Sequence, residues 1–169
     1  MIIFVFGLPG SGKSYFASRL AELIDAEHLS SDRLRKEMFE QSTYSDKEKE
    51  AVYLKMLEKM KSATAQKKHL VLDATFHKNN RRKLFTDEIK EAGVSFIEVW
   101  ADDKITRQRL KYKRPDSDAD YEVHKLIKQH WEPLEEPHLL LQSTNNNIDN
   151  MLQSALQHLH WKDDKRTTK

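Results

Sequence analysis

Residues 7–14 have the types and spacing of a group that binds phosphate. They read Gly7-Leu8-Pro9-Gly10-Ser11-Gly12-Lys13-Ser14, the complete pattern G-x-x-x-x-G-K-[ST]. The glycines let the backbone turn its N–H groups inward around a polyphosphate, at the positive end of a helix dipole. Lys13 would then reach the β- and γ-phosphates, and the Ser14 hydroxyl would bind Mg²⁺. The residues predicted to bind the nucleotide are Gly7, Pro9, Gly10, Ser11, Gly12, Lys13, Ser14 and Tyr15.

The segments on both sides of this loop have the patterns that a phosphate-binding loop requires. Residues 2–6 are all apolar, which is typical of a buried parallel strand. Apolar residues then recur at helical spacing over residues 15–24. A Gly/Ser-rich turn that carried a lysine by chance would not have this context. We therefore expect the chain to bind a nucleoside triphosphate.

Two aspartates follow predicted strands, and the carboxyl ends of parallel strands form the ligand crevice of such sheets. Asp73 ends the run 69–73, where a carboxylate can hold a metal ion directly or through water. The alternative for Asp73 is the cap of a turn. Asp32 follows the run 26–31 and could orient an acceptor hydroxyl and take its proton. An aspartate in the first turn of a helix is also a common cap, and local sequence leaves both roles of Asp32 open.

Basic residues gather just before the polar segment 115–120, at Arg107, Arg109, Lys111, Lys113 and Arg114. A mobile lid that brings guanidinium groups to a transferring phosphate has this composition, and so has a solvated helix face. Because Arg109 and Arg114 lie about one helical turn apart, both could point the same way.

Two further basic pairs follow the predicted strands. Arg33 and Arg35 flank the helix start at Asp32, where an arginine could bind an anionic acceptor. Arg81 and Arg82 come shortly after the run 69–73, and surface charge is the simpler interpretation of this second pair.

Apolar runs alternate with helical patterns along the chain, which indicates an α/β fold around a parallel sheet. The predicted strands are residues 2–6, 26–31, 69–73, 94–100 and 138–143. The predicted helices are residues 15–24, 32–39, 46–66, 80–91, 104–113, 121–131 and 148–159. At 169 residues the chain is long enough for one such domain, which we assign to residues 1–161 with a lid at about 107–120. The polar residues 162–169 are expected to be disordered.

The composition excludes several classes of function. The chain has no cysteine, which excludes disulfides, zinc–thiolate sites, iron–sulfur clusters and a cysteine nucleophile. With 29 basic and 27 acidic residues, bulk electrostatics would not hold the protein to nucleic acid, although a local basic groove stays open. No apolar segment could span a membrane, and the N-terminal run is too short for a signal peptide. We therefore expect a cytoplasmic protein with no membrane attachment, and no protein partner is evident.

In combination and in this order, the segments resemble the small P-loop kinases related to the kinase domain of polynucleotide kinase and to zeta toxins. The resemblance rests on residues 7–14, on Ser30-Ser31-Asp32-Arg33 with Arg35, on Val71-Leu72-Asp73-Ala74-Thr75-Phe76 with Arg81, on Arg109-Leu110 and on residues 117–120. It covers roughly the first 125 residues and is far more specific than the loop alone. It implies a P-loop fold with a five-stranded parallel sheet of order 2-3-1-4-5, a small helical lid, and ATP as the phosphate donor.

The resemblance also implies roles for individual residues. By similarity, Asp32 is the general base and Arg35 contacts the acceptor's phosphate, with Arg81 as a further candidate for substrate binding. Asp73 joins Ser14 as the metal-associated acid. Lys13 and the lid arginines Arg109 and Arg114 would offset the charge that develops on the transferring group. Two features depart from the family: Arg33, not a second acidic residue, follows Asp32, and the chain is too short for the substrate-binding insertions of zeta toxins.

The leading hypothesis is an ATP-dependent kinase that needs Mg²⁺ and transfers the γ-phosphate to an acceptor hydroxyl. The first choice of acceptor is the 5′-hydroxyl of a polynucleotide, and the alternative is a nucleoside, metabolite or antibiotic. A nucleotide-dependent switch or motor is disfavoured, because Asp73 is followed by Ala-Thr-Phe and neither by the Asp-x-x-Gly of GTPase switches nor by the adjacent glutamate of motor ATPases. A catalytically silent P-loop domain is the remaining alternative, but no expected site residue is missing.

Overall fold

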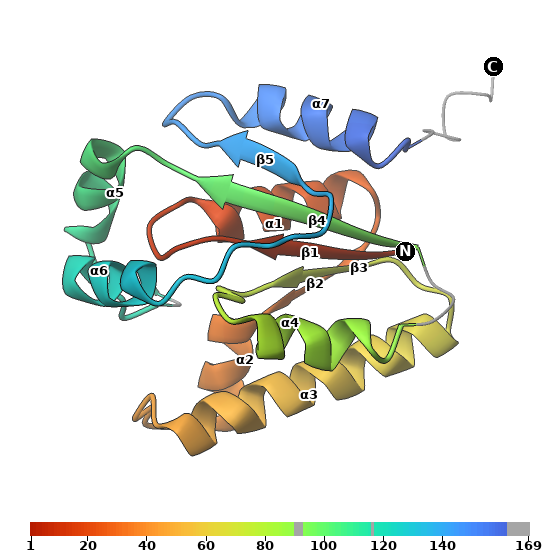
Figure 1. Cartoon of the computed structure of the whole chain (residues 1–169), viewed down its shortest axis with the longest axis horizontal. Coiled ribbons are helices and arrows are strands. Elements are labelled where there is room, and N and C mark those ends of the chain that lie inside the picture. The colour runs from red at the N-terminus through yellow and green to blue at the C-terminus, as the bar shows by residue number, and fades with distance from the viewer. Residues whose placement is uncertain (90–92, 116, 162–169) are drawn as a thin grey trace.

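The described part of the protein is built around a five-stranded parallel sheet (Figure 1). The computed structural model describes residues 1–89, 93–115 and 117–161. The strands are β1 Ile2–Phe6, β2 Glu27–Ser30, β3 Leu70–Asp73, β4 Val94–Trp100 and β5 Leu139–Gln142. Their order in the sheet is β2-β3-β1-β4-β5, which confirms the predicted fold class.

Helices cover both faces of the sheet and its carboxyl edge. They are α1 Lys13–Leu23, α2 Ser31–Met38, α3 Asp46–Ala65, α4 Asn79–Thr86, α5 Asp103–Leu110, α6 Tyr121–Gln129 and α7 Ile148–His158. Figure 1 shows α1 and α7 on one face, α3 and α4 on the other, and α5 and α6 beyond the ends towards which β1 and β4 point. The predicted lid, at about 107–120, comprises the end of α5 and the segment between α5 and α6. No helix in the described ranges is long and apolar enough to cross a membrane.

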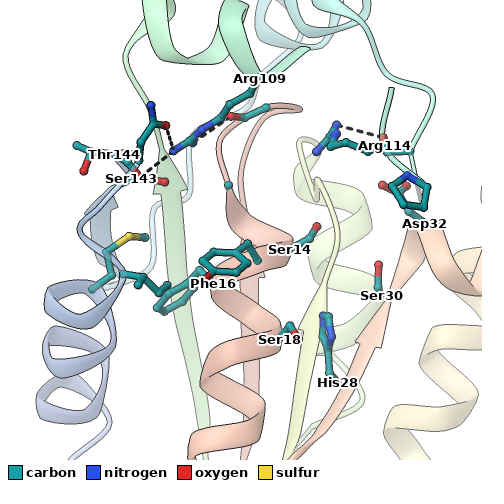
Figure 2. A pocket seen from close by; sticks show the side chains of 18 of the residues that line it. Ser14, Phe16, Ser18, His28, Ser30, Asp32, Arg109, Arg114, Ser143 and Thr144 are labelled. Carbon is teal, nitrogen blue, oxygen red and sulfur yellow. Dashed lines mark hydrogen bonds between the residues drawn. The ribbon is translucent and has the colours of Figure 1, made fainter. Parts of the chain in front are cut away.

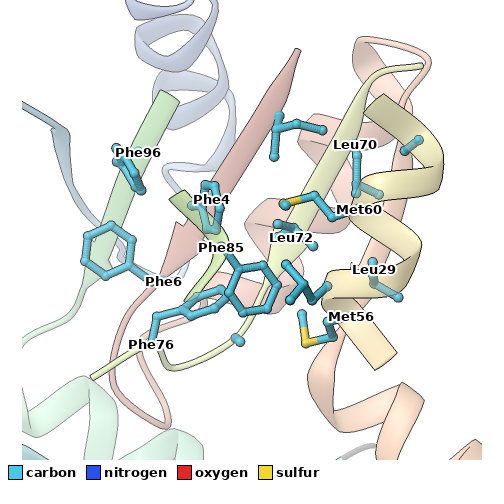
Figure 3. Close-up of a cluster of buried hydrophobic side chains, with 14 of the residues drawn as sticks. Phe4, Phe6, Leu29, Met56, Met60, Leu70, Leu72, Phe76, Phe85 and Phe96 are labelled. Atoms are coloured by element: carbon cyan, nitrogen blue, oxygen red, sulfur yellow. The ribbon is translucent and has the colours of Figure 1, made fainter. Parts of the chain in front are cut away.

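The central strand β1 is buried on both sides, as a strand in the middle of a doubly covered parallel sheet must be. Successive side chains point to opposite faces. Phe4 therefore packs against Phe76 and Phe85 on the side of α3 and α4, with ring centroids 5.5 and 5.9 Å away (Figure 3). Ile3 and Val5 join the core beneath α1 and α7. This continuous apolar run fixes the strand that leads into residues 7–14.

The register of the parallel strands brings the predicted site segments to one edge of the sheet. Asp73, the last residue of β3, lies opposite Val5 of β1 and Ser30 of β2. The loop 7–14 begins just after β1, and α2 begins just after Ser30. Residues far apart in sequence thus meet because their strands end at the same level.

The predicted helices 80–91 and 104–113 both extend too far, and the second of them, α5, ends at Leu110. Residues 80–91 have helical spacing, but α4 ends at Thr86 and the chain continues in turns through Ile89. Ile89 packs against the core from this turn, so its apolar character extended the helical pattern beyond the true end of the helix. Residues 90 and 91 of that prediction lie outside the described residues, and so do residues 162–169.

Candidate active site

The loop between β1 and α1 has a conformation that only glycine allows at two of its positions. Gly12 directly precedes α1 in the left-handed region, with φ 89°, and a Cβ there would lie 2.7 Å from the Ser143 hydroxyl oxygen. At Gly7 a Cβ would lie 2.2 Å from the carbonyl oxygen of Val99. The helix then begins at Lys13, so its free N–H groups and positive dipole end adjoin the loop. This is the arrangement that binds phosphate groups.

A cavity of about 590 Å³ opens beside this loop (Figure 2). Its volume lies within the range of small-molecule binding sites. Three parts of the chain join Gly10, Gly12 and Ser14 in lining it. The first is the edge formed by β2 and α2, with His28, Ser30, Asp32 and Arg33. The second is the lid, with Arg109, Arg114, Pro115 and Ser117. The third is the segment that leads into α7 and its first turn, with Ser143, Thr144, Asn145, Asn147, Ile148 and Met151.

Asp73 has the environment of an ionised carboxylate. It is buried, which would raise its pKa, but a hydrogen bond from His28 and the charge of Lys13 hold the pKa of Asp73 below its usual value. Its Oδ2 lies 3.3 Å from Nε2 of His28. Its other oxygen, Oδ1, is buried and has no hydrogen-bond partner among the described residues.

These groups fit the divalent cation that the loop motif implies. Mg²⁺ prefers oxygen ligands and keeps several of its waters, and a buried carboxylate oxygen without a partner is such a ligand or a partner for such a water. The Ser14 hydroxyl also contributes to the low pKa of Asp73, so the two predicted metal-associated residues are close together. Ser14 and Asp73 would hold the cation, directly or through water.

Asp32 lies across the cavity from the loop, in the first turn of α2. Burial raises the pKa of Asp32, and the positive charge of Lys13 partly offsets the shift. The residue that caps α2 is Ser30, which makes no side-chain capping bond. Asp32 thus lines the cavity within range of the charge of Lys13, and Ser30, not Asp32, stands at the N-cap of α2.

The two predicted lid arginines lie on different sides of the cavity (Figure 2). Arg109 donates hydrogen bonds to the carbonyl oxygens of Ser11, at 3.1 Å, and Thr144, at 2.9 Å. It therefore ties the loop to the segment before α7. Arg114 lies on the side of Asp32 and influences its pKa. The expectation that both arginines point the same way is wrong, because α5 ends at Leu110 and Arg114 belongs to the following loop.

The two other predicted substrate contacts, Arg35 and Arg81, are not among the described residues that line the cavity. Arg35 is buried, and its Nε lies 3.4 Å from Oε1 of Glu48. Burial alone would raise the pKa of Glu48, but hydrogen bonds from Ser42 and Thr43 hold it below its usual value, so Glu48 is a charged partner. Arg81 lies over the ring of Tyr53, 5.3 Å from its centroid.

The lid segment is joined to other parts of the site. The Tyr44 hydroxyl donates to Asp118 over 2.9 Å, and the Lys36 ammonium donates to the carbonyl oxygen of Pro115. Nδ1 of His124, in α6, donates a hydrogen bond to the carbonyl oxygen of Pro9 over 2.8 Å. The lid therefore contacts α2 and the loop before α3, and α6 contacts the phosphate-binding loop.

Sequence reasoning missed His28 and the segment 143–151 as parts of the site. A signal for His28 was present: it is two residues before Ser30 in a strand, so both side chains point to the same face. No comparable signal exists for Ser143 and Thr144, whose place depends on the pairing of β5 with β4 and on Arg109.

Comparison with solved structures shows the same fold in several kinases. A sugar kinase from Janibacter sp. HTCC2649 is 16% identical, with a TM-score of 0.72 and coverage of 94% of each chain. A gluconokinase from Sinorhizobium meliloti 1021 is 17% identical, with a TM-score of 0.70 and coverage of 94% of this chain and 90% of that one. The Mycobacterium tuberculosis APS kinase CysC, solved with AMPPNP and APS, is 18% identical, with a TM-score of 0.70 and coverage of 94% and 96%.

At these identities the likeness establishes the P-loop kinase fold and leaves the acceptor open. No curated protein sequence matches the chain. A family model described as an AAA domain matches residues 2–134, which include the phosphate-binding loop, Asp32, Asp73 and the lid. Since that match spans most of the 169 residues, the chain belongs to this AAA domain family of P-loop proteins.

Proposed function

We propose that this protein is an ATP-dependent phosphotransferase that acts on a hydroxyl group bound beside Asp32. The observation that supports this most directly is the position of Asp32, whose carboxylate shares one cavity with the loop that would hold the triphosphate. A domain that only bound nucleotide would not need a second, half-buried carboxylate opposite the loop lysine. The kinase fold of the structural neighbours is consistent with this proposal.

The reaction would be an in-line transfer. The acceptor oxygen attacks the γ-phosphorus, the bond from that phosphorus to the β–γ bridging oxygen breaks, and ADP leaves with the electron pair. Asp32 orients the hydroxyl and takes its proton. Arg114 lines the cavity, and the charges of Lys13 and Arg114 both act on Asp32, so these two residues would neutralise negative charge on the transferring group. Mg²⁺ would neutralise charge on the β- and γ-phosphate oxygens.

Arg109 has a different role in this proposal from the catalytic one expected from sequence. Its guanidinium is engaged by backbone carbonyl oxygens of the loop and by Thr144. We infer that it fixes the wall of the nucleotide end of the cavity, formed by the loop and the segment that leads into α7. Arg114 remains the lid arginine for catalysis.

For the acceptor, the site favours a small hydroxyl compound over a polynucleotide 5′ end. The arginine that would contact a nucleic-acid phosphate, Arg35, is buried against Glu48. The lid is joined to α2 and to the loop before α3 through Lys36 and Tyr44, and its residues Arg114 and Pro115 line the cavity together with Asp32. A polynucleotide end would need an open, basic path to that carboxylate. That the acceptor is the 5′-hydroxyl of a polynucleotide stays a prediction, and the same assay should test it.

The test is a transfer assay with ATP, Mg²⁺ and separate panels of sugars, nucleosides and 5′-hydroxyl oligonucleotides. Radiolabel from [γ-³²P]ATP should appear on a member of a small-molecule panel. In the Asp32→Asn variant the rate of transfer should fall by roughly 10²- to 10⁴-fold, the usual contribution of a general base, with ATP affinity retained. Label on oligonucleotides alone would overturn the choice of acceptor, and full activity of Asp32→Asn would remove Asp32 from the mechanism.

A further inference from the structure

His28 and Asp73 form a buried pair that joins two neighbouring strands beneath the cavity. His28 lies on β2 and Asp73 ends β3, and Nε2 of the histidine is 3.3 Å from Oδ2 of the aspartate. The side chain of His28 is 11% exposed and that of Asp73 1%. Figure 2 shows His28 below Ser30 along the same strand, on the side that faces α1. The roles proposed for the phosphate-binding loop and for Asp32 do not explain why a histidine is buried at this position.

The direction of the hydrogen bond follows from chemistry. An ionised carboxylate can only accept hydrogen bonds, so Nε2 of His28 must carry the proton and donate it to Oδ2. This bond occupies one oxygen of Asp73 and fixes the plane of the carboxylate. The second oxygen, Oδ1, is left buried with no partner among the described residues. A buried carboxylate oxygen without a hydrogen bond lowers the stability of the fold unless a ligand, such as a cation or its water, binds to it.

We propose that His28 is the positioning residue of the cation site: by holding Oδ2 of Asp73, it presents Oδ1 to Mg²⁺ or to one of its waters, beside Ser14. Side chains that orient a metal-binding carboxylate commonly matter almost as much as the ligand itself. This inference rests on the proposed use of ATP with Mg²⁺, and it adds a residue that acts on the cation through Asp73.

The chain offers a matched control, since a second histidine–carboxylate pair joins β4 and the start of β5, at the opposite edge of the sheet. His138 lies just before β5, and its Nε2 is 3.5 Å from Oε2 of Glu98 on β4. Both of these side chains are also largely buried. Neither residue lines the cavity around Asp32. Loss of the His138 pair should therefore disturb packing to a similar degree without affecting the cation.

The experiment measures the affinity of a non-hydrolysable ATP analogue by calorimetry, with excess Mg²⁺ and with EDTA, in each variant. The ratio of the two affinities reports how strongly cation and nucleotide are coupled. In His28→Leu this ratio should fall by roughly 10- to 100-fold, the usual cost of losing such a positioning group. The affinity in EDTA should stay near that of the unaltered protein. His138→Leu should keep the full ratio.

Conservative variants separate positioning from packing. In His28→Gln the amide nitrogen can reach the position of Nε2, so the ratio of the affinities with Mg²⁺ and with EDTA should be close to that of the unaltered protein. In His28→Asn the side chain is one carbon shorter and the amide cannot reach Oδ2, so the ratio should stay low. This pair of polar variants keeps the test valid if His28→Leu does not fold.

Several outcomes would overturn the proposal. A normal ratio in both His28→Leu and His28→Asn would show that Asp73 needs no positioning. An equal loss of affinity with Mg²⁺ and with EDTA would make His28 a packing residue only. If the unaltered protein couples Mg²⁺ to the analogue but transfers phosphate to no acceptor, the proposed function fails while the role of His28 stands.

Discussion

The two ends of the cavity are built in different ways. At the nucleotide end, the binding groups are backbone amides from consecutive residues, 7–14, held by one strand and one helix. At the acceptor end, the groups are side chains from α2, the loop before α3 and the lid. They are joined by contacts such as Tyr44–Asp118 and Lys36–Pro115, which link residues more than 70 positions apart. The first end can be recognised from a short motif, whereas the second exists only once the chain has folded.

Because the two ends are built differently, we expect them to affect different properties of the protein: nucleotide affinity at one end, and turnover or acceptor KM at the other. In the proposed function, the nucleotide end would hold the phosphate groups of ATP, which are the same whatever the acceptor. The acceptor end, with Asp32 and the lid contacts, would be specific to the hydroxyl compound. We therefore expect substitutions at the first end to change nucleotide affinity, and substitutions at the second to change turnover or the KM of the acceptor.

The largest expected effect on binding is that of Lys13→Ala. A hydrogen bond to a charged group contributes about 1.5–3 kcal/mol, so ATP affinity should weaken by roughly 10- to 100-fold. Calorimetry with ATP and EDTA measures this without turnover. Lys36→Ala, at the acceptor end, is the control and should leave ATP affinity unchanged. Equal affinities of Lys13→Ala and the unaltered protein would contradict the assignment of the phosphate-binding loop.

Arg109→Lys tests whether that arginine belongs to the nucleotide end. Two different nitrogens of the guanidinium, Nη1 and Nη2, bond to Ser11 and Thr144, and the single nitrogen of a lysine cannot occupy both positions. We expect nucleotide affinity to fall about tenfold, equivalent to about 1.4 kcal/mol, with kcat changed little. Arg107→Lys, on the exposed side of the same helix, is the matched control. A large loss of kcat at unchanged affinity would restore the catalytic role expected from sequence.

Much of the fold follows from sequence because its determinants are local. The run 2–6 is apolar at every position and can only be a doubly buried strand, and the glycines before Lys13 specify the turn that follows it. The places of Asp32 and Asp73 at one edge of the sheet could be predicted for the same reason, since each ends or follows a strand. The family resemblance then supplied the strand order, which periodicity alone does not contain.

The misplaced residues share a different cause. Arg35 was expected to face an acceptor, but its partner Glu48 comes from α3 and is held by Ser42 and Thr43 in a loop with no local signature. Arg109 was expected over the phosphates, but its partner Thr144 depends on the position of β5. In both cases the decisive contact joins separate elements, and no short pattern of residues encodes it.

The pH dependence of turnover should distinguish Asp32 from an ordinary surface aspartate. Burial raises the pKa of Asp32, and a general base must be ionised to act. The acid limb of kcat/KM should therefore lie above the usual aspartate value of about 3.9. Because the folded-state pKa is the higher one, Asp32 also lowers stability as the pH rises from the unfolded value through the folded one. Asp32→Asn should thus melt at a higher temperature than the unaltered protein at neutral pH, and an unchanged melting temperature would contradict the shift.

Tyr44→Phe should have the smallest effect and is the most selective test of the acceptor end. It removes the hydroxyl that donates to Asp118 and keeps the ring, which lies 4.7 Å from the guanidinium carbon of Arg35. An exposed neutral donor to a carboxylate contributes at most about 1 kcal/mol, so the KM of the acceptor should rise by roughly threefold. ATP affinity should not change, because no contact of Tyr44 reaches the phosphate-binding loop. Tyr112→Phe, at an exposed position in the same lid, should change neither quantity. If Tyr44→Phe altered ATP affinity as much as acceptor KM, the two ends of the cavity would not be separable, and the lid would act on the site as a whole.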